Sequence, residues 1–129
     1  MAIYHMESKI VSRGMGRSVV AASAYMSCSR LYNDYDGIQH DYTKKQGLVW
    51  QQVFLPAQAP QEWRDREQLW NAVEAAEKTK DSRLAREIIV ALPVELEPDE
   101  QIALTSAYIS KQFVADGMCA DAAIHDTDG

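Results

Sequence analysis

A tyrosine near the start of the chain stands beside residues suited to phosphate chemistry. Tyr25 lies in a predicted helix over residues 19–31, which follows a glycine-rich turn at residues 14–16. Ser18 is a good N-cap for this helix. Backbone N–H groups at a helix start attract anions, and Arg17 adds a side chain that binds phosphate with two hydrogen bonds. The pattern predicts a phosphate close to Tyr25, but a tyrosine on an apolar helix is often a packing residue, so the spacing leaves both roles open.

A histidine and a glutamate stand in apolar surroundings later in the chain. His125 ends a predicted strand and is followed by Asp126 and Asp128, and an imidazole with nearby oxygens is a combination that binds divalent metals. One histidine does not make a metal site, and it equally suits a surface position. Glu87 is the one acidic residue of the apolar strand over residues 86–92. Strand alternation turns it either toward solvent or inward, and the pattern favours neither.

Length and composition limit the class of protein. The chain has 129 residues, of which 47% are hydrophobic, which suits one folded domain with a real core. Cys28 and Cys119 lie far apart without a CxxC pattern, so free thiols in a reducing compartment are expected. No run approaches eighteen apolar residues and no signal-peptide pattern opens the chain, which predicts a cytoplasmic protein without a membrane segment.

The net charge of -6 counts against tight non-specific binding of nucleic acid. The charge is unevenly distributed, however. Residues 1–47 carry six basic and four acidic side chains, a balance of 6 − 4 = +2, whereas residues 48–129 carry seven and fifteen, a balance of 7 − 15 = -8. Any contact with DNA is therefore expected mainly from the first third of the chain.

Hydrophobic periodicity and turn residues predict alternating strands and helices. The expected elements are a strand over 2–13, the helix over 19–31, a short strand within the polar segment 32–47, a strand over 48–55, a helix over 60–80, a strand over 86–92, a helix from Pro98 that ends at Gly117, and a strand over 118–125. Long helices between strands are typical of a parallel sheet, but no glycine-rich phosphate loop follows a strand. An α+β arrangement fits equally well.

Several short motifs stand in a fixed order along nearly the whole chain. They are Ala2 to His5, Gly16 to Ala22, Ala24-Tyr25, Asp41 to Lys45, Leu69 to Glu74, Leu84 to Glu87 leading to Ala91 to Pro93, and Ala123 to Asp126. In this order and spacing they resemble the MobA/MobL family of plasmid mobilisation relaxases. The resemblance implies an α+β fold with a central, mainly antiparallel sheet covered by helices. It also implies that residues 1–129 are the amino-terminal part of a single relaxase domain.

The activity that the resemblance implies is that of a HUH-type DNA nickase. Such enzymes cut one strand at a plasmid origin of transfer and so begin conjugative mobilisation. A divalent cation, Mg²⁺ or Mn²⁺, held by histidines polarises the scissile phosphate, and a helix-borne tyrosine attacks it to leave a 5′-phosphotyrosine link. The implied partners are single-stranded origin DNA, the relaxosome and the coupling proteins of type IV secretion.

Carried over residue by residue, the resemblance matches Tyr25 to the nucleophile and His125 to the first of three metal-binding histidines. Glu87 matches an acidic position and is expected to accept a proton or to orient a histidine. The family often has a second acid two positions further on, where this chain has Ile89. The expected DNA contacts, with tyrosine rings stacking on unpaired bases, are Arg13, Arg17, Tyr42, Lys44, Lys45 and Arg86.

The chain departs from the family pattern after His125, where the family continues to Asn-Pro-His-x-His on the next strand. The sequence ends at Gly129 before that motif. The resemblance therefore predicts weak or no metal binding, little or no nicking by these 129 residues, and self-association through an exposed sheet edge. Two other hypotheses stay open: a non-catalytic single-stranded DNA-binding module, and a protein-interaction module that uses Trp63 and Trp70.

Overall fold

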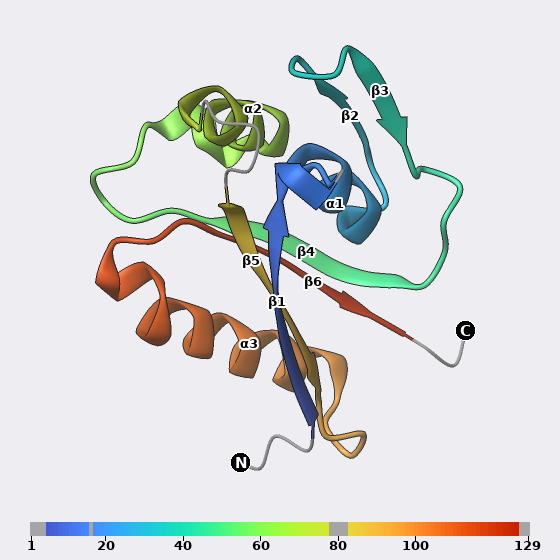
Figure 1. The fold of residues 1–129 in the computed structure, drawn as a ribbon. Coiled ribbons are helices and arrows are strands. Elements are labelled where there is room, and N and C mark those ends of the chain that lie inside the picture. Colours follow the sequence, from blue (N-terminus) through green and yellow to red (C-terminus); the bar gives the residue numbers. More distant parts are fainter. Residues whose placement is uncertain (1–4, 16, 78–82, 127–129) are drawn as a thin grey trace.

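The computed structural model describes residues 5–15, 17–77 and 83–126, and they form an α+β fold (Figure 1). The strands are β1 (His5–Ser12), β2 (Arg30–Asn33), β3 (Ile38–Asp41), β4 (Leu48–Phe54), β5 (Arg83–Ala91) and β6 (Ala120–His125). The helices are α1 (Val19–Ser27), α2 (Arg66–Ala76) and α3 (Pro98–Gln112), with 3-10 turns η1 (Arg13–Met15), η2 (Gln61–Arg64) and η3 (Val114–Asp116). None of the helices among these residues has the length and apolar character needed to cross a membrane.

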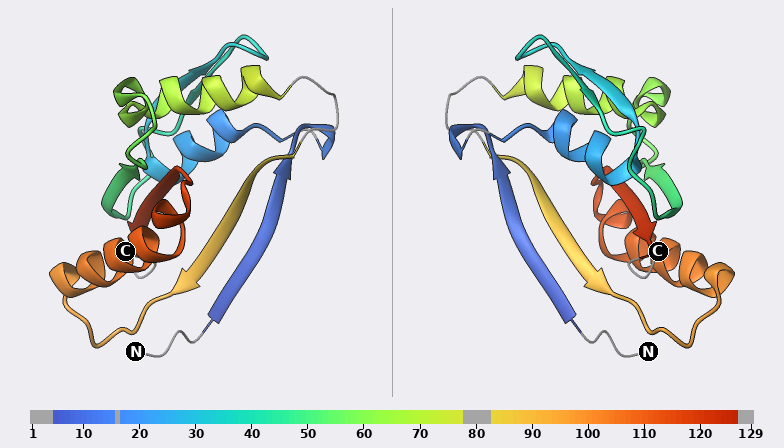
Figure 2. Two further views of the ribbon diagram at one scale, coloured as in Figure 1. Left: turned by 90° about the vertical axis from the view of Figure 1, so that its left-hand side faces the viewer. Right: turned by 90° about the vertical axis from the view of Figure 1, so that its right-hand side faces the viewer.

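All strand pairs of the described residues are antiparallel, so the parallel-sheet alternative is excluded. They form three two-stranded ladders, β1–β5, β2–β3 and β4–β6, rather than one continuous sheet. The long β1–β5 ladder runs alongside the remaining elements and joins them near the start of α1 and ahead of α3 (Figure 2). The predicted α+β class with antiparallel strands is confirmed, and the division into separate ladders was not predicted.

The first helix is shorter than predicted. It ends at Ser27 because Cys28 takes a left-handed conformation with φ of 54°, and the Cys28 N–H bonds back to the last turn. A strand pair, β2–β3, then replaces the single short strand that was expected. The helix buries Val19, Val20, Ser23, Ala24 and Ser27.

The two later helices follow their capping residues. The segment predicted as one helix over 60–80 divides at Asp65, whose side chain accepts the Glu67 N–H and so begins α2 one turn after Pro60 opens η2. The last three residues of that prediction lie outside the described part of the chain. Helix α3 begins at Pro98 as predicted, and Gly117, with φ of 88°, closes the turn that follows it.

Two apolar clusters meet at α2. Val11, Val19 and Leu84 form one cluster, which joins β1, β5 and the start of α1. Val20, Ala24 and Leu31 form the second, which joins α1 to the β2–β3 hairpin. Trp70 on α2 packs against both clusters. Helix α2 therefore holds α1 between the β1–β5 ladder and the β2–β3 hairpin.

Side chains of α2 also complete the hydrogen bonding of the β2–β3 hairpin. Glu67 accepts the backbone N–H of Tyr32 at 2.7 Å, and Asn71 donates to the Tyr32 carbonyl at 2.8 Å. The Asn71 side-chain oxygen accepts the N–H of Asp34 at 2.9 Å. These bonds orient the hairpin on α2, so the segment that leaves β3 is directed toward α1.

Candidate functional site

A broad groove of about 2030 Å³ separates the β1–β5 ladder from α1, α3 and β6. Seven of the nine residues predicted to act at the site line it, although they come from distant parts of the sequence: Arg17, Tyr25, Tyr42, Lys45, Arg86, Glu87 and His125. Arg13 and Lys44 lie outside the groove lining. The fold therefore gathers most of the predicted residues around one cavity, which local sequence patterns alone do not do.

Tyr25 projects from α1 and is not a core residue. It is 54% exposed, so the packing role that its sequence position allowed is contradicted. The ring of Tyr42 meets the Tyr25 ring edge to face, with centroids 5.2 Å apart and an interplanar angle of 82°. The Lys45 ammonium lies 4.5 Å from the centroid of the Tyr25 ring, where the negative face of the ring attracts a cation. Tyr25 is thus accessible to a large ligand while its ring is held by two neighbours.

The turn after β3 positions both of these neighbours. Asp41 accepts hydrogen bonds from the Thr43 backbone N–H at 2.9 Å and from the Thr43 hydroxyl at 2.6 Å. These two bonds, with the hydroxyl the stronger influence, hold the pKa of the Asp41 carboxyl below its usual 3.8. The Lys45 N–H bonds to the Tyr42 carbonyl at 3.1 Å. This compact turn brings Tyr42 and Lys45 back against α1.

His125 at the end of β6 completes the group around Tyr25. Burial lowers the pKa of the His125 imidazole below its usual 6.5, and the positive charge of Lys45 lowers this pKa further. A hydrogen bond to the backbone of Met26, next to Tyr25 on α1, acts in the opposite direction. The net lowering favours the neutral imidazole near pH 7, which is the form that binds metals.

The described residues around His125 do not by themselves make a divalent cation site. Asp126 follows it and lines the same groove. Across residues 5–15, 17–77 and 83–126, no group of three histidine, cysteine or acidic side chains lies close enough to hold a metal. A cation bound here would need ligands beyond this set.

Glu87 lies on the opposite wall of the groove, in β5. Its carboxylate pairs with the Lys9 ammonium at 3.4 Å and with an Arg17 guanidinium nitrogen at 3.3 Å. Lys9 stands directly across the β1–β5 ladder from Glu87, and sequence patterns gave no reason to select it. Among the described residues the carboxylate is therefore engaged by two cations rather than by Tyr25 or His125, and its expected role in proton transfer stays a prediction.

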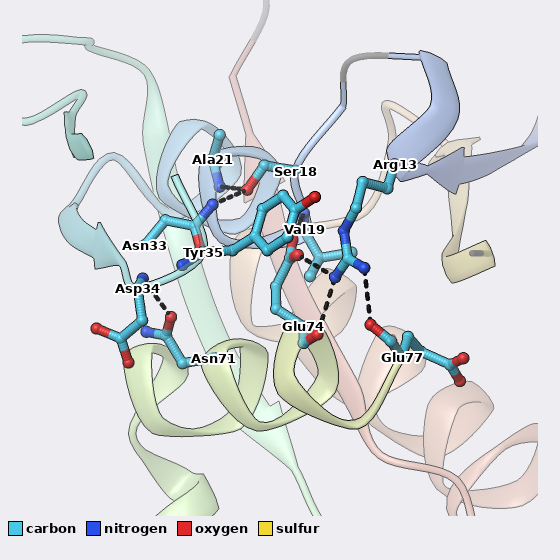
Figure 3. A network of polar contacts seen from close by, with 10 residues as sticks. All are labelled: Arg13, Ser18, Val19, Ala21, Asn33, Asp34, Tyr35, Asn71, Glu74 and Glu77. Atoms are coloured by element: carbon cyan, nitrogen blue, oxygen red, sulfur yellow. Dashed lines mark hydrogen bonds and ion pairs between the residues drawn. The ribbon is translucent and has the colours of Figure 1, made fainter. Parts of the chain in front are cut away.

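The start of α1 does not offer the free N–H groups that the sequence predicted for an anion. The Glu74 carboxylate of α2 accepts the Val19 N–H at 3.2 Å, and the Ser18 hydroxyl accepts the Ala21 N–H at 3.2 Å (Figure 3). A carboxylate from within the protein already occupies this helix end. Arg17 turns instead toward Glu87 and the Ile10 carbonyl.

Arg13 belongs to the same network and faces inward. One guanidinium nitrogen donates to a Glu74 carboxylate oxygen at 2.8 Å, and the two side chains are only 7% and 3% exposed. The guanidinium also donates to the Glu77 carbonyl at 2.7 Å and lies 4.1 Å from the centroid of the Tyr35 ring (Figure 3). This arrangement does not support the expectation that Arg13 contacts DNA, because the Arg13 guanidinium pairs with the buried Glu74 carboxylate.

A second buried carboxylate lies behind Tyr25 and was missed by sequence reasoning. Asp121 of β6 accepts hydrogen bonds from the Ser23 hydroxyl at 2.5 Å, from Arg66 Nε at 2.8 Å and from Trp70 Nε1 at 2.8 Å. Its side chain is 3% exposed. The one available signal was an acid in an otherwise apolar strand, the same signal that drew attention to Glu87.

The comparison with known sequences identifies the class of protein that this fold and site define. Residues 17–129 match the MobA/MobL family, and the chain belongs to it. Its relatives include the "Conjugal transfer protein TraA" of Agrobacterium fabrum, 43% identical over all of this chain and 13% of the relative's length. The "Mobilization protein MobL" of Acidithiobacillus ferridurans is 38% identical over 97% of this chain and 32% of its own length. The chain thus spans less than a third of either relative.

A solved structure supports the same assignment. The protein described under "Molecular Basis of Vancomycin Resistance Transfer in Staphylococcus aureus" superposes with a TM-score of 0.91 at 37% sequence identity. The match covers 99% of this chain and 65% of the other. The relaxase-like α+β fold that the motifs predicted is therefore confirmed.

Proposed function

We propose that this chain carries the nucleophile and part of the DNA-binding surface of a site- and strand-specific DNA nickase that begins the mobilisation of a plasmid. The observation that carries the proposal is the placement of Tyr25. It is exposed at a groove, beside a lysine and near a histidine whose pKa is lowered. Membership of the MobA/MobL family and the names of the relatives support the same function.

The proposed reaction is a transesterification with Tyr25 as nucleophile. Its phenolic oxygen forms a bond to phosphorus, and the bond from phosphorus to the 3′ oxygen breaks. The products are a 5′-phosphotyrosine link and a free 3′-hydroxyl, which takes up a proton as the phenol gives one up. A phenol has an ordinary pKa of about 10, so attack at neutral pH needs a proton acceptor, for which Glu87 stays the predicted group. The phosphodiester energy is kept in the covalent link.

Lys45 is suited to neutralise charge in this reaction, because its ammonium already lies at the Tyr25 ring. Charge builds up on the phosphate oxygens as the bond forms, and a nearby cation stabilises it. We propose that the complete domain also holds Mg²⁺ or Mn²⁺, which would polarise the phosphate, with His125 as one of its ligands. The described residues supply too few ligands for that ion, so further ones must come from elsewhere.

The DNA surface is proposed to follow the groove. Arg17, Tyr42, Lys45 and Arg86 line it, and Lys44 is exposed next to it. Unpaired bases are suited to stack on exposed tyrosine rings while the cations track the backbone. Single-stranded origin DNA is the proposed partner, and the relaxosome and type IV coupling proteins are proposed for the whole protein, together with a cytoplasmic location.

The experiment that tests this proposal replaces Tyr25 with phenylalanine. A single-stranded oligonucleotide from the plasmid's origin of transfer is incubated with the protein and Mg²⁺ or Mn²⁺, and covalent adducts are resolved on a denaturing gel. The unaltered protein, supplied with the rest of its domain, should form an adduct that Tyr25→Phe abolishes, while a gel shift shows unchanged DNA affinity. An adduct that survives the substitution would refute Tyr25 as nucleophile.

A non-catalytic single-stranded DNA-binding module is the second candidate for these 129 residues alone. It is favoured by the lack of a three-ligand metal group among the described residues. This candidate predicts DNA binding that weakens with salt but no adduct from the 129-residue chain. Robust nicking by this chain would exclude it.

A further inference from the structure

Helix α1 is attached to β6 by polar contacts on both sides of Tyr25. On one side the Ser23 hydroxyl donates to the Asp121 carboxylate at 2.5 Å. On the other, the backbone of Met26 lies beside the His125 ring and raises the pKa of the imidazole. Ser23 precedes Tyr25 by two residues and Met26 follows it directly. The two contacts therefore bracket the tyrosine.

The two β6 residues in these contacts share one face of the strand. Asp121 and His125 are four positions apart, and side chains at even spacing along a strand point to the same side. Both face α1. The distance between them along β6 thus sets where the segment from Ser23 to Met26 can lie.

Contacts with α2 fix the position of the Asp121 carboxylate independently of α1. One carboxylate oxygen accepts the Arg66 Nε–H at 2.8 Å, and the other accepts the Trp70 indole N–H at 2.8 Å. Both donors belong to α2, and the carboxylate is 3% exposed. The Arg66 charge offsets the cost of burying the carboxylate. The Ser23 hydroxyl therefore bonds to the Asp121 carboxylate, whose position is set by β6 and by its two donors on α2.

An apolar contact at this point would attach α1 to β6 without setting its rotation. Apolar packing has no direction, whereas a hydrogen bond to a charged group is short and directional. Tyr25 is 54% exposed, and the two contacts of its ring, with Tyr42 and Lys45, come from the turn after β3 rather than from β6. Rotation of α1 about its axis would move the phenol along the groove and away from His125.

From this geometry we infer that Asp121, acting through Ser23, is a positioning residue that fixes the rotation of α1 and so holds the Tyr25 phenol in register with His125. The effect on a reaction rests on the function proposed above, but the effect on the tyrosine does not. The Asp121 carboxylate bonds to Ser23, Arg66 and Trp70, and it acts on Tyr25 through Ser23.

The test uses Ser23→Ala, because this change removes the contact and leaves the Arg66–Asp121 ion pair intact. Ser27→Ala is the matched control, since Ser27 is an equally buried serine of α1 whose hydroxyl bonds to the Ser23 carbonyl rather than to β6. Ser23→Thr restores a hydroxyl at the same position. Tyr25 is replaced by 3-fluorotyrosine in each protein, and its fluorine NMR resonance is recorded without DNA.

In Ser23→Ala the fluorine resonance should move toward that of free fluorotyrosine, whereas Ser27→Ala should leave it in place and Ser23→Thr should restore it. In the complete domain, Ser23→Ala should slow single-turnover adduct formation on origin DNA by roughly tenfold with unchanged DNA affinity, because small misplacements of a reacting group reduce rate rather than binding. An unmoved resonance would overturn the inference, as would an unchanged adduct rate in a protein that is active. Absence of any adduct in the unaltered complete domain would instead overturn the proposed function. The fluorine resonance would still show whether the Ser23–Asp121 contact holds Tyr25 in place.

Discussion

The Lys45 ammonium lies 4.5 Å from the centroid of the Tyr25 ring, and the same lysine lowers the pKa of His125. One cation therefore acts on both residues that are proposed to meet the scissile phosphate. Tyr25 and His125 come from α1 and β6, which are 125 − 25 = 100 residues apart in the sequence, and Lys45 comes from a turn between them. This relationship gives the first of four predictions.

Replacing Lys45 with alanine should weaken binding of single-stranded DNA and make its salt dependence shallower. The slope of log affinity against log salt should fall in magnitude by about 0.7, the value for one phosphate contact on a single strand. The pKa of His125 should rise, because a repelling positive charge is removed while burial is unchanged. Gel shifts across a salt series measure the slope of the DNA affinity, and NMR titration of the imidazole measures the pKa of His125.

Lys111→Ala is the matched control for this prediction, since Lys111 lies near the end of α3 and outside the groove lining. It should leave both the slope and the His125 pKa as they are. Equal effects of the two substitutions would show that Lys45 contributes only to the net charge.

Replacing Glu74 with glutamine should destabilise the fold strongly. Glu74 and Arg13 are 3% and 7% exposed, so the substitution removes the negative charge from a buried ion pair. Breaking a buried pair in this way typically costs about 3–5 kcal/mol. The free energy of unfolding, measured by urea denaturation, should fall by an amount in this range.

The control for that measurement is Glu77→Gln, at an exposed side chain whose residue bonds Arg13 through its backbone carbonyl. An exposed substitution of this kind usually changes stability by no more than about 0.5 kcal/mol. Similar losses for the two variants would contradict a special role of the Glu74 carboxylate.

The Asp41–Thr43 turn should depend on pH in the acidic range. The folded pKa of Asp41 is held below 3.8, so the turn's contribution to stability is present above pH 3.8 and is lost as the pH falls through the folded pKa. Thr43→Val removes the largest cause of the shift, and the pKa of Asp41 should then rise back toward 3.8. Carbon-13 NMR of the Asp41 carboxyl gives both values, and an unchanged pKa in the variant would contradict the assigned cause.

Self-association through a strand edge is the fourth prediction. Each strand in the described part of the chain is hydrogen-bonded to one other strand only, so the ladders keep open edges. Ile89 of β5 is 45% exposed, and a lysine there should discourage pairing between molecules. Light scattering should show concentration-dependent association of the unaltered chain that Ile89→Lys reduces.

Val94→Lys tests whether charge alone explains such a result. Val94 is 93% exposed but lies after β5, outside the ladder. The Val94→Lys substitution should leave association unchanged. A monomer at all concentrations, before any substitution, would contradict the edge-pairing prediction.

Local sequence signals were most successful where a capping residue or a turn residue acts alone. Ser18 and Pro98 were each expected at the helix end where the structure has them, whereas α3 ends at Gln112 and Gly117 closes the 3-10 turn after it. The signals failed where a cap was not recognised: Cys28 ends α1 in a left-handed conformation that residues other than glycine seldom adopt. Its sequence neighbours are compatible with a helix, so periodicity extended α1 too far.

The sequence by itself determined the family, the order of most strands and helices, and the choice of Tyr25 as the residue to test. It did so because motifs, caps and periodicity are carried by residues close together in the chain. Only the tertiary structure decided that Arg13 is buried against Glu74, that Glu74 fills the start of α1, and that Asp121 bonds to Ser23. The two partners of each pair lie more than fifty residues apart. Nothing in the sequence near either partner specifies which charged groups will meet when α2 packs against the β1–β5 and β2–β3 ladders.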